Sequence, residues 1–254
     1  MYDNVIMESR RIINVQCHCH LGDNIINFIF FHQIKNYIEE NNIIINYYCL
    51  EQYHDNVKDF NCSENIIIKK FTHDVGYVLW QATVQKLPIA EDHLCLMFNT
   101  FLNNHNIPIR VDTFEYKDND LINRYQALDE IHKNIEILIV NSTPLSGQYV
   151  YDRDDWNNFL IKLSKKYVIA TTQKVNDDII SLHNISVKNI AAIATNVKKI
   201  IAVNTGPSLP LYNTDILDNI EVLHLFGAGD HLFKTRKFKA YYNDRISDVL
   251  HNML

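Results

Sequence analysis

Residues 12–24, IINVQCHCHLGDN, and residues 199–208, KIIAVNTGPS, each run from an apolar stretch through small polar residues into a predicted helix. The first backbone N–H groups of a helix have no partner within it, so such a corner is a natural place to hold an anion. The first corner carries a carboxylate, Asp23, whereas the second carries hydroxyls and no acid. An acid facing a phosphate-binding corner across a cleft is what a two-domain transferase needs.

Apolar strand patterns alternate with helical patterns along the chain. We expect strands at 12–19, 43–50, 65–69, 135–140, 167–172, 199–203 and 221–226, and helices at 24–40, 90–103, 121–132, 154–166, 187–195 and 241–254. Strands separated by helices imply parallel sheets built from right-handed βαβ units. We therefore predict an α/β fold of two Rossmann-like domains that face each other across a cleft.

The domain boundary is expected near residues 115–134, because the alternation restarts at Ile135 after a polar, charged stretch. We assign residues 1–125 to an N-terminal domain and residues 126–254 to a C-terminal domain. The active site is expected in the cleft between them, at the carboxyl ends of the strands.

Composition narrows the class of protein. The chain has 254 residues, 47% of them hydrophobic, and a formal net charge of −6, which argues against a nucleic-acid binder. No apolar run approaches the roughly 18 residues of a membrane span, and the polar start has no signal core. Five cysteines at irregular positions are typical of reduced thiols, and we expect a cytoplasmic protein. Abundant Asn and Ile indicate an AT-rich genome, as in many bacteria and large DNA viruses.

Gly22 and Asp23 allow two interpretations. Glycine permits a tight corner, and an acid at a helix N-terminus is held in its charged form by the helix dipole. A helix cap is the commoner role for aspartate at this position. A general base is the alternative, because a charged carboxylate at the carboxyl end of a strand faces the cleft.

The run Cys17-His18-Cys19-His20 resembles part of a metal site. Alternate residues of a strand point to opposite faces, so the two cysteines lie on one side and the two histidines on the other. Two ligands on a face are half of a zinc site, and the sequence has no Cys-x-x-Cys or His-x-x-x-His partner. We therefore predict no metal and no cofactor, with the cysteines in the core and the histidines near the cleft.

Residues 141–148, NSTPLSGQ, follow the most hydrophobic strand of the second half. The hydroxyls of Thr143 and Ser146, together with Gly147, Gln148 and exposed amides, are suited to cradle a phosphate. An ordinary polar loop is an equal alternative.

Residues 204–208 are a more specific signal. Thr205 and Ser208 flank a turn, and Gly206 and Pro207 suit the first turn of a helix with free N–H groups. A simple turn is the alternative.

Motifs of several other enzyme classes are incomplete or missing in the sequence. Residues 226–230, FGAGD, lack the third glycine of a dinucleotide fingerprint, and the chain has neither a Gly-x-Ser-x-Gly elbow nor a Walker loop. Dinucleotide-dependent, hydrolase and kinase functions are therefore not supported.

Several motifs resemble those of one family. Residues 21–26, LGDNII, resemble the Gly-Asp motif that opens the heptosyltransferase-like glycosyltransferases of the GT-B fold. The 204–208 corner is similar to the family's Asp-Thr-Gly-Pro-x-His segment. Three other segments also resemble parts of these enzymes: residues 137–141 with Trp156, residues 186–193 and residues 225–227. The motifs agree with the family in order and spacing over about two-thirds of the chain. The chain is most similar to compact forms encoded by large DNA viruses, with a bacterial origin as the alternative.

The resemblance implies acceptor binding in the first domain, nucleotide-sugar binding in the second, and metal-independent transfer with inversion. Asp23 matches the family's catalytic base, and Thr205, Gly206 and Ser208 match its donor-binding corner. Asn204 stands where the family has an acid, and Leu209 stands about where it has a histidine. The resemblance therefore leaves the contacts to the donor sugar undefined.

In the leading interpretation, Asp23 accepts a proton from an acceptor hydroxyl as that oxygen attacks the anomeric carbon of a nucleoside-diphosphate sugar. The leaving diphosphate would be stabilised by N–H groups at 205–208 and by the hydroxyls of Thr143 and Ser146. Lys174 or Arg153 would supply positive charge; a solvated surface charge is the alternative for both, and the favoured one for Arg153. The acceptor is a glycan or another hydroxyl compound.

Two rival functions stay open. A nucleotide-sugar 2-epimerase on the same fold would need further groups in the cleft, for which His18, His20 and His183 are candidates, but no epimerase motif is present. A non-catalytic sugar- or nucleotide-binding module is the other, and the presence of Asp23 argues against it.

Overall fold

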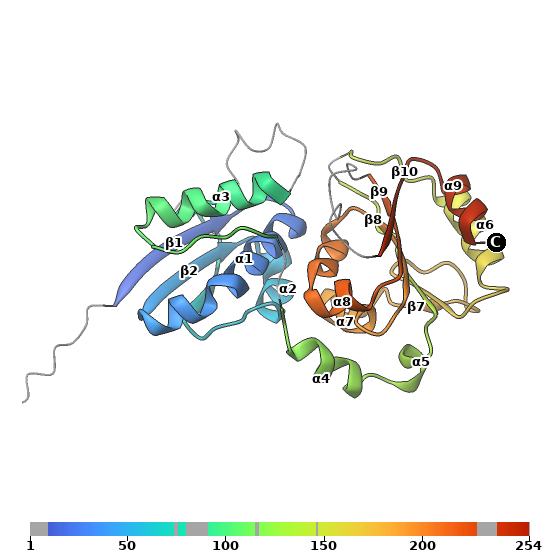
Figure 1. Ribbon diagram of the computed structural model, residues 1–254, viewed down its shortest axis with the longest axis horizontal. Coiled ribbons are helices and arrows are strands. Elements are labelled where there is room, and N and C mark those ends of the chain that lie inside the picture. Colours follow the sequence, from blue (N-terminus) through green and yellow to red (C-terminus); the bar gives the residue numbers. More distant parts are fainter. Residues whose placement is uncertain are drawn as a thin grey trace, which may run out of the picture. The chain divides into compact units, whose positions relative to one another are not determined.

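The computed structural model describes residues 10–73, 76–79, 91–114, 117–145, 147–227 and 238–253, without the side chains of residues 91, 92 and 250–253 (Figure 1). The chain divides into two compact units, residues 1–80 and residues 81–254. Each unit has its own parallel sheet. The predicted boundary at residue 125 separates acceptor and donor roles. It stays a prediction, because the compact units do not reveal where either substrate binds.

The first unit is built on four strands in the order β3-β2-β1-β4. They are β1 (Arg11–Cys17), β2 (Ile43–Cys49), β3 (Ile66–Lys70) and β4 (Tyr77–Val78), and the helices are α1 (Leu21–Glu40), η1 (Glu51–Tyr53) and α2 (His54–Asp59). The strand sequences RIINVQC and IIINYYC are rich in β-branched and aromatic residues, which fit a pleated, half-buried surface. Buried and half-buried residues alternate along β2, as expected of a strand with one well-covered face.

Helix α1 packs on the face of the sheet that carries Tyr47. The rings of Phe28 and Phe31 meet the Tyr47 ring edge-on, with centroid distances of 4.9 and 5.8 Å. Every residue from Asn24 to Phe31 is buried. The N-terminal half of α1 is thus a core helix, which is why its sequence is apolar nearly all round.

In the second unit, the described residues form a sheet of six strands in the order β10-β9-β8-β5-β6-β7. They are β5 (Ile137–Val140), β6 (Ile169–Thr171), β7 (Ile180–Ser181), β8 (Lys199–Val203), β9 (Val222–Phe226) and β10 (Lys239–Asn243). The helices are α3 (Glu91–Asn104), α4 (Asp120–Ala127), α5 (Glu130–Lys133), α6 (Arg153–Leu163), α7 (Val187–Ala194), η2 (Gly206–Tyr212), α8 (Thr214–Asn219) and α9 (Ile246–Met253). In Figure 1, α6 and α9 lie on one face of this sheet, and α7 and α8 lie on the other.

The order of these strands reverses at β5. The chain places β6 and β7 on one side of β5, and then returns to place β8, β9 and β10 on the other side. Strands β5 and β8 are therefore neighbours, and Val140 pairs with Ala202 at their carboxyl ends. Ligands of open α/β sheets bind at such a topological switch point.

Trp156 belongs to α6 and lies in the core between that helix and the sheet. Its side chain is fully buried, its ring lies 5.0 Å from that of Phe226, and it stacks on Tyr151 at 5.2 Å. The indole Nε1 donates a hydrogen bond of 3.1 Å to the Tyr149 hydroxyl. Trp156 thus connects the loop after β5 to the sheet.

The structure confirms the predicted α/β class with two separate parallel sheets, because Val15 lies in one sheet and Val203 in the other. Strand β8 has the predicted bounds, and Ser186 caps α7, accepting a 3.2 Å hydrogen bond from the Asn189 N–H. The helix predicted to begin at Asp154 begins one residue earlier, at Arg153. The sequence also suggests Asp154 or Asp155 as its cap, which is wrong: Asp152 is the cap, and its Oδ1 accepts hydrogen bonds from the N–H groups of Asp154 and Asp155.

Two predicted helices differ from the structure. The helix expected at 121–132 is divided into α4 and α5, because Leu128 has an extended backbone with ψ 154°. The helix expected at 241–254 begins only at Ile246. Residues Tyr241–Asn243 belong to β10, because they pair with β9 instead.

A buried ion pair connects α7 to the segment that precedes α4. The Lys188 ammonium lies 3.0 Å from the Asp118 carboxylate, and both side chains are over 90% buried. The carboxylate of Asp120 lies 3.2 Å from the same ammonium and also accepts from Arg124. These hydrogen bonds lower the pKa of Asp120, with that from Arg124 the larger cause.

None of the helices described is both long enough and apolar enough to span a membrane.

The buried side chain of His224 is expected to make the stability of the protein depend on pH. It is fully buried in β9, its ring stacks on Tyr241 at 4.8 Å, and burial lowers its pKa below the usual histidine value. The unfolded chain therefore binds a proton, below about pH 6.5, that the folded chain excludes. We expect the free energy of unfolding to fall as the pH drops from 7 towards 5, with His224 contributing up to about 1.4 kcal/mol per pH unit.

Urea unfolding across this pH range checks the prediction. His224→Gln should flatten the pH profile, whereas His183→Gln, at an exposed histidine of the same unit, should leave it unchanged. The same slope in both variants would contradict a role for His224.

Candidate functional site

Asp23 lies at the corner between β1 and α1. Strand β1 ends at Cys17, and α1 begins at Leu21, so Asp23 is in the first helical turn. Its Oδ2 accepts a 2.9 Å hydrogen bond from the His20 N–H, which is a capping interaction. Burial raises the pKa of Asp23, and the His20 N–H opposes this shift. The carboxylate is thus both a cap and a stronger proton acceptor than an ordinary aspartate.

The neighbouring cysteines and histidines differ in exposure. Cys17 is buried, whereas His18 and His20 are exposed in the loop that leads to α1. The Cys17 thiol is hydrogen-bonded to Cys19, which raises the pKa of Cys17 and lowers that of Cys19. Across the residues that the structure describes, no three metal-ligating side chains are grouped to hold an ion. The absence of a metal remains a prediction.

Asn141 joins the loops at the carboxyl ends of β5 and β6. Its N–H donates to the Thr172 hydroxyl at 3.0 Å, and its Oδ1 accepts from that hydroxyl and from the Gln173 N–H at 3.1 and 2.9 Å. Gln173 in turn reaches Thr143, with 3.3 Å between its Nε2 and the threonine Oγ1. The loop that carries the predicted phosphate ligand Thr143 is therefore fixed against β6.

The 204–208 corner begins where β8 ends. The Ser208 hydroxyl accepts from the Thr205 N–H at 3.1 Å and donates to the Thr205 carbonyl at 2.9 Å. The Thr205 hydroxyl donates to the Val203 carbonyl at 3.2 Å. Both predicted hydroxyls therefore stabilise the corner itself. Within the described parts of the chain, no hydrogen bond engages the Gly206 N–H.

Asn204 and Gly227 connect the loops after β8, β9 and β5. The Asn204 N–H donates to the Phe226 carbonyl at 2.8 Å, and its side chain donates to the Gly227 carbonyl at 3.3 Å. Gln148 donates to the Asn204 carbonyl. Gly227 has φ +72°, and a Cβ there would lie 2.8 Å from the Tyr149 Cβ, so only glycine fits without a shift.

The structure thus brings together most of the predicted donor-site residues. Gln148 contacts the 204–208 corner at Asn204, Thr143 in the same loop is held by Gln173 at the end of β6, and Gly147 in that loop has φ +71°. Ser146 lies outside the described residues. Lys174 follows Gln173 but pairs with Asp177 at 2.7 Å, and both are exposed. Gly22 and Asp23 belong to the first unit.

The sequence analysis did not identify Asn141, Thr172, Gln173 and Gly227 as parts of this site. A signal was present for the first three, because Asn141 directly follows one predicted strand, and Thr172 and Gln173 lie at the end of another. Polar residues at the carboxyl ends of adjacent parallel strands meet at one edge. That β5 and β6 are adjacent depends on strand order, which the sequence does not state.

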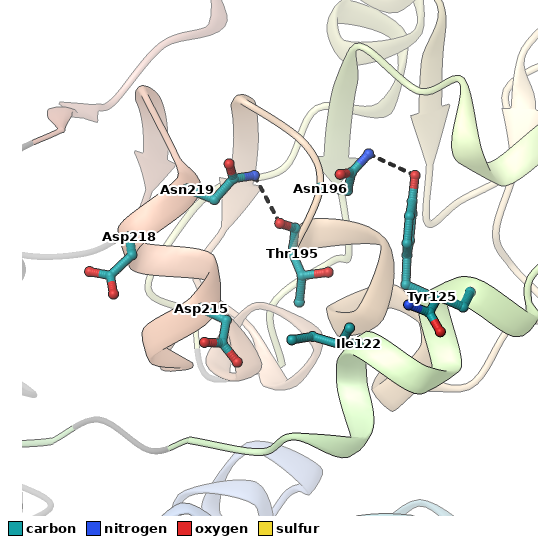
Figure 2. Close-up of a pocket in the computed structure, with 8 residues that line it drawn as sticks. Ile122, Tyr125, Thr195, Asn196, Asp215, Asp218 and Asn219 are labelled. Atoms are coloured by element: carbon teal, nitrogen blue, oxygen red, sulfur yellow. Dashed lines mark hydrogen bonds between the residues drawn. The ribbon is translucent and has the colours of Figure 1, made fainter.

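A separate cavity of about 520 Å³ lies near the amino ends of β8 and β9 (Figure 2). Its lining residues are Ile122, Tyr125, Gln126, Thr195, Asn196, Asp215, Asp218 and Asn219. The Asn219 amide donates to the Thr195 carbonyl at 2.8 Å, and the Asn196 amide donates to the Tyr125 hydroxyl at 2.7 Å (Figure 2). No predicted site residue contributes to it.

Solved structures that are similar to this chain include three glycosyltransferases. The chain is similar to the Escherichia coli heptosyltransferase WaaC with ADP, with a TM-score of 0.61, 7% identity and coverage of 95% of this chain and 98% of that chain. It is also similar to a family 9 glycosyl transferase from Veillonella parvula, with a TM-score of 0.50, 11% identity and coverage of 95% and 88%. A third similar structure is the iron-containing dodecameric glycosyltransferase TibC of enterotoxigenic Escherichia coli, with a TM-score of 0.52, 10% identity and coverage of 92% and 63%.

At these identities the likeness shows the fold, which is the predicted heptosyltransferase-like GT-B fold. No protein-family model matches the sequence, and no curated protein matches it.

Proposed function

We propose that this protein is a glycosyltransferase that moves a sugar from a nucleoside-diphosphate sugar to a hydroxyl acceptor. One observation carries the proposal: the loop after β5, which includes Thr143 and Gln148, contacts the 204–208 corner through the hydrogen bond from Gln148 to Asn204, at the switch point between β5 and β8. The likeness to a heptosyltransferase solved with ADP supports a nucleotide-sugar donor.

The donor diphosphate is proposed to bind at the 204–208 corner. The Gly206 N–H begins η2, and glycine lets a phosphate approach the backbone closely. The Ser208 and Thr205 hydroxyls hold the corner rigid, so that its N–H groups need little reorganisation when the leaving diphosphate gains charge. Thr143, Ser146, Gly147, Gln148, Pro207 and Lys174 are proposed as further donor-site residues.

Asp23 is proposed as the general base. The acceptor oxygen forms a bond to the anomeric carbon, its proton passes to the Asp23 carboxylate, and the bond from that carbon to the diphosphate breaks with the electron pair leaving on the phosphate oxygen. Attack opposite the leaving group inverts the anomeric centre. A carboxylate whose pKa is raised by burial suits this role, because proton transfer is most efficient when the base has a pKa near the working pH.

A non-catalytic nucleotide-binding module is a second candidate. Two observations favour it: the Ser208 hydroxyl is occupied within its own turn, and Asp23 has a structural role as a cap. Incubation with a panel of nucleotide sugars separates the two candidates. A transferase releases sugar slowly to water, whereas a binding module leaves the donors intact.

Nucleotide binding should occur without metal. We expect at least one of ADP, GDP, UDP or their sugars to raise the melting temperature in the presence of EDTA. Gly206→Val should weaken the binding of that nucleotide by about tenfold or more, because the new side chain blocks the approach of the phosphate. Isothermal titration calorimetry measures the change.

Ala127→Val is the matched control, because it adds the same kind of side chain at an exposed position of α4. If Gly206→Val folds and binds the nucleotide as tightly as this control, the corner is not the phosphate site.

A further inference from the structure

A chain of hydrogen bonds runs from the core of the first unit to Asp23. The Tyr47 hydroxyl donates to Asn24 Oδ1 at 2.8 Å, and the Asn24 amide donates to the His20 carbonyl at 2.9 Å. The His20 N–H then donates to Asp23 Oδ2 at 2.9 Å. Three consecutive bonds thus connect a strand residue of β2 to the candidate base.

The direction of this chain is fixed at its inner end. The Asn27 amide donates to the Tyr47 oxygen at 3.0 Å, so the single hydroxyl proton of Tyr47 is directed to Asn24. With its Oδ1 accepting that proton, Asn24 turns its NH₂ group towards His20. The Tyr47 ring is held between Phe28 and Phe31, so the hydroxyl has little freedom to move.

Stability alone gives little reason for such a network. Tyr47, Asn24 and Asn27 are fully buried, and Asn27 Oδ1 has no hydrogen-bond partner among the described residues. An unsatisfied buried polar atom costs about 1–3 kcal/mol, and apolar residues of similar shape would avoid that cost. Polar residues at such positions are expected where a functional site needs a fixed geometry.

We propose that Tyr47 is a positioning residue that orients the Asp23 carboxylate through Asn24 and His20. Two hydrogen bonds hold the His20 carbonyl, one from the Asn24 amide and one of 3.3 Å from the Asn24 N–H. The peptide unit on the other side of His20 holds Asp23 Oδ2. Fixing His20 therefore fixes Asp23 Oδ2. The other carboxylate oxygen, Oδ1, then points in a defined direction.

The test is Tyr47→Phe, which removes one oxygen atom and keeps the ring. Without its proton donor the Asn24 amide is free to turn, and the His20 N–H holds Asp23 less well. Because that hydrogen bond lowers the pKa of Asp23, the pKa should rise in the variant, as measured by carbon-13 NMR of the Asp23 carboxyl group. The other titratable groups that act on this carboxyl among the described residues are His20, Cys17 and Cys19, so their signals are followed in the same titration.

Tyr48→Phe is the matched control, since Tyr48 is the next residue of β2 and lies on the opposite face of the strand. It should leave the Asp23 pKa unchanged. If Tyr47→Phe does not fold, Asn24→Ala breaks the same chain one residue closer to Asp23 and takes its place. An unchanged Asp23 pKa in the folded variant would overturn the proposal.

The activity readout rests on the proposed function and is separate from the pKa readout. With a working acceptor, Tyr47→Phe should lower kcat by about tenfold to a hundredfold, as expected for a displaced catalytic group, and leave the KM of the donor unchanged. A shifted Asp23 pKa in a protein without transferase activity would refute the proposed function and support the positioning role. A rise in donor KM with kcat unchanged would overturn the positioning role.

Discussion

Asp23→Asn is expected to keep the fold and nucleotide affinity of the protein and to lose transfer to the acceptor by about 10²–10⁴-fold. In the structure, Asp23 Oδ2 accepts the His20 N–H at 2.9 Å. An asparagine Oδ1 accepts the same hydrogen bond, and asparagine caps helices about as well as aspartate. An amide does not take up a proton at neutral pH, so only the role as a base is removed.

Three measurements on this variant separate the two roles of Asp23. The melting temperature tests the role of Asp23 as a cap. Calorimetry measures the nucleotide affinity, which is proposed to depend on the second unit, and product formation from donor and acceptor tests the role of Asp23 as a base. Asp23→Ala is the companion variant, because it removes both the cap and the base and should lose about 0.5–2 kcal/mol of stability in addition. Activity of Asp23→Asn within a few-fold of the unmodified protein would assign Asp23 to the cap alone.

The corners of the site were predictable because each depends on a short stretch of sequence. Lys199–Val203 is a continuous apolar strand, and the small residues that follow it allow few structures other than a tight turn into a helix. A capping role for Asp23 was predicted as one of two alternatives, but with the helix starting at residue 24. The helix begins three residues earlier, so His20 is the N-cap and Asp23 is the third helical residue, whose carboxylate accepts the His20 N–H. Local signals of this kind need no knowledge of which strands are neighbours.

The contacts between loops were not predictable in the same way. Asn141 bonds to Thr172 and Gln173, which are 31 and 32 residues away in sequence, and only the adjacency of β5 and β6 brings them together. Gly227 belonged to a motif that was considered for a cofactor. Its positive φ and its contact with Tyr149 instead give it a role in packing the loop after β9 against the loop after β5.

The short strands escaped prediction for another reason. Strands β4 and β7 contain two residues each, so no alternation of polar and apolar residues develops. Strand β10 has the sequence KAYYN and leads directly towards α9, so the helical pattern of the following residues extended over it. Each is an edge strand that exists because a neighbouring strand offers backbone partners.

Lys188→Met is expected to lower the free energy of unfolding of the second unit by about 3–5 kcal/mol. Lys188 is the second residue of α7, where the helix dipole disfavours a positive charge. The carboxylates of Asp118 and Asp120, at 3.0 and 3.2 Å, compensate for that position and for burial. Methionine preserves the packing of the side chain and leaves the buried Asp118 carboxylate without its lysine.

The free energy can be measured by urea unfolding followed through the fluorescence of Trp156. Trp80 is the other tryptophan of the chain, so a Trp80→Phe background isolates the signal of the second unit. Lys165→Met, at an exposed lysine just after α6, is the control and should change stability by less than about 0.5 kcal/mol.

The double variant Asp118→Asn with Lys188→Met decides the cause of the loss. Removing both charges eliminates the buried carboxylate that has lost its lysine, so the double variant should be more stable than Lys188→Met alone. If the two substitutions instead add, the loss comes from packing around Lys188. If Lys188→Met is as stable as the Lys165→Met control, the ion pair contributes nothing to the stability of the second unit.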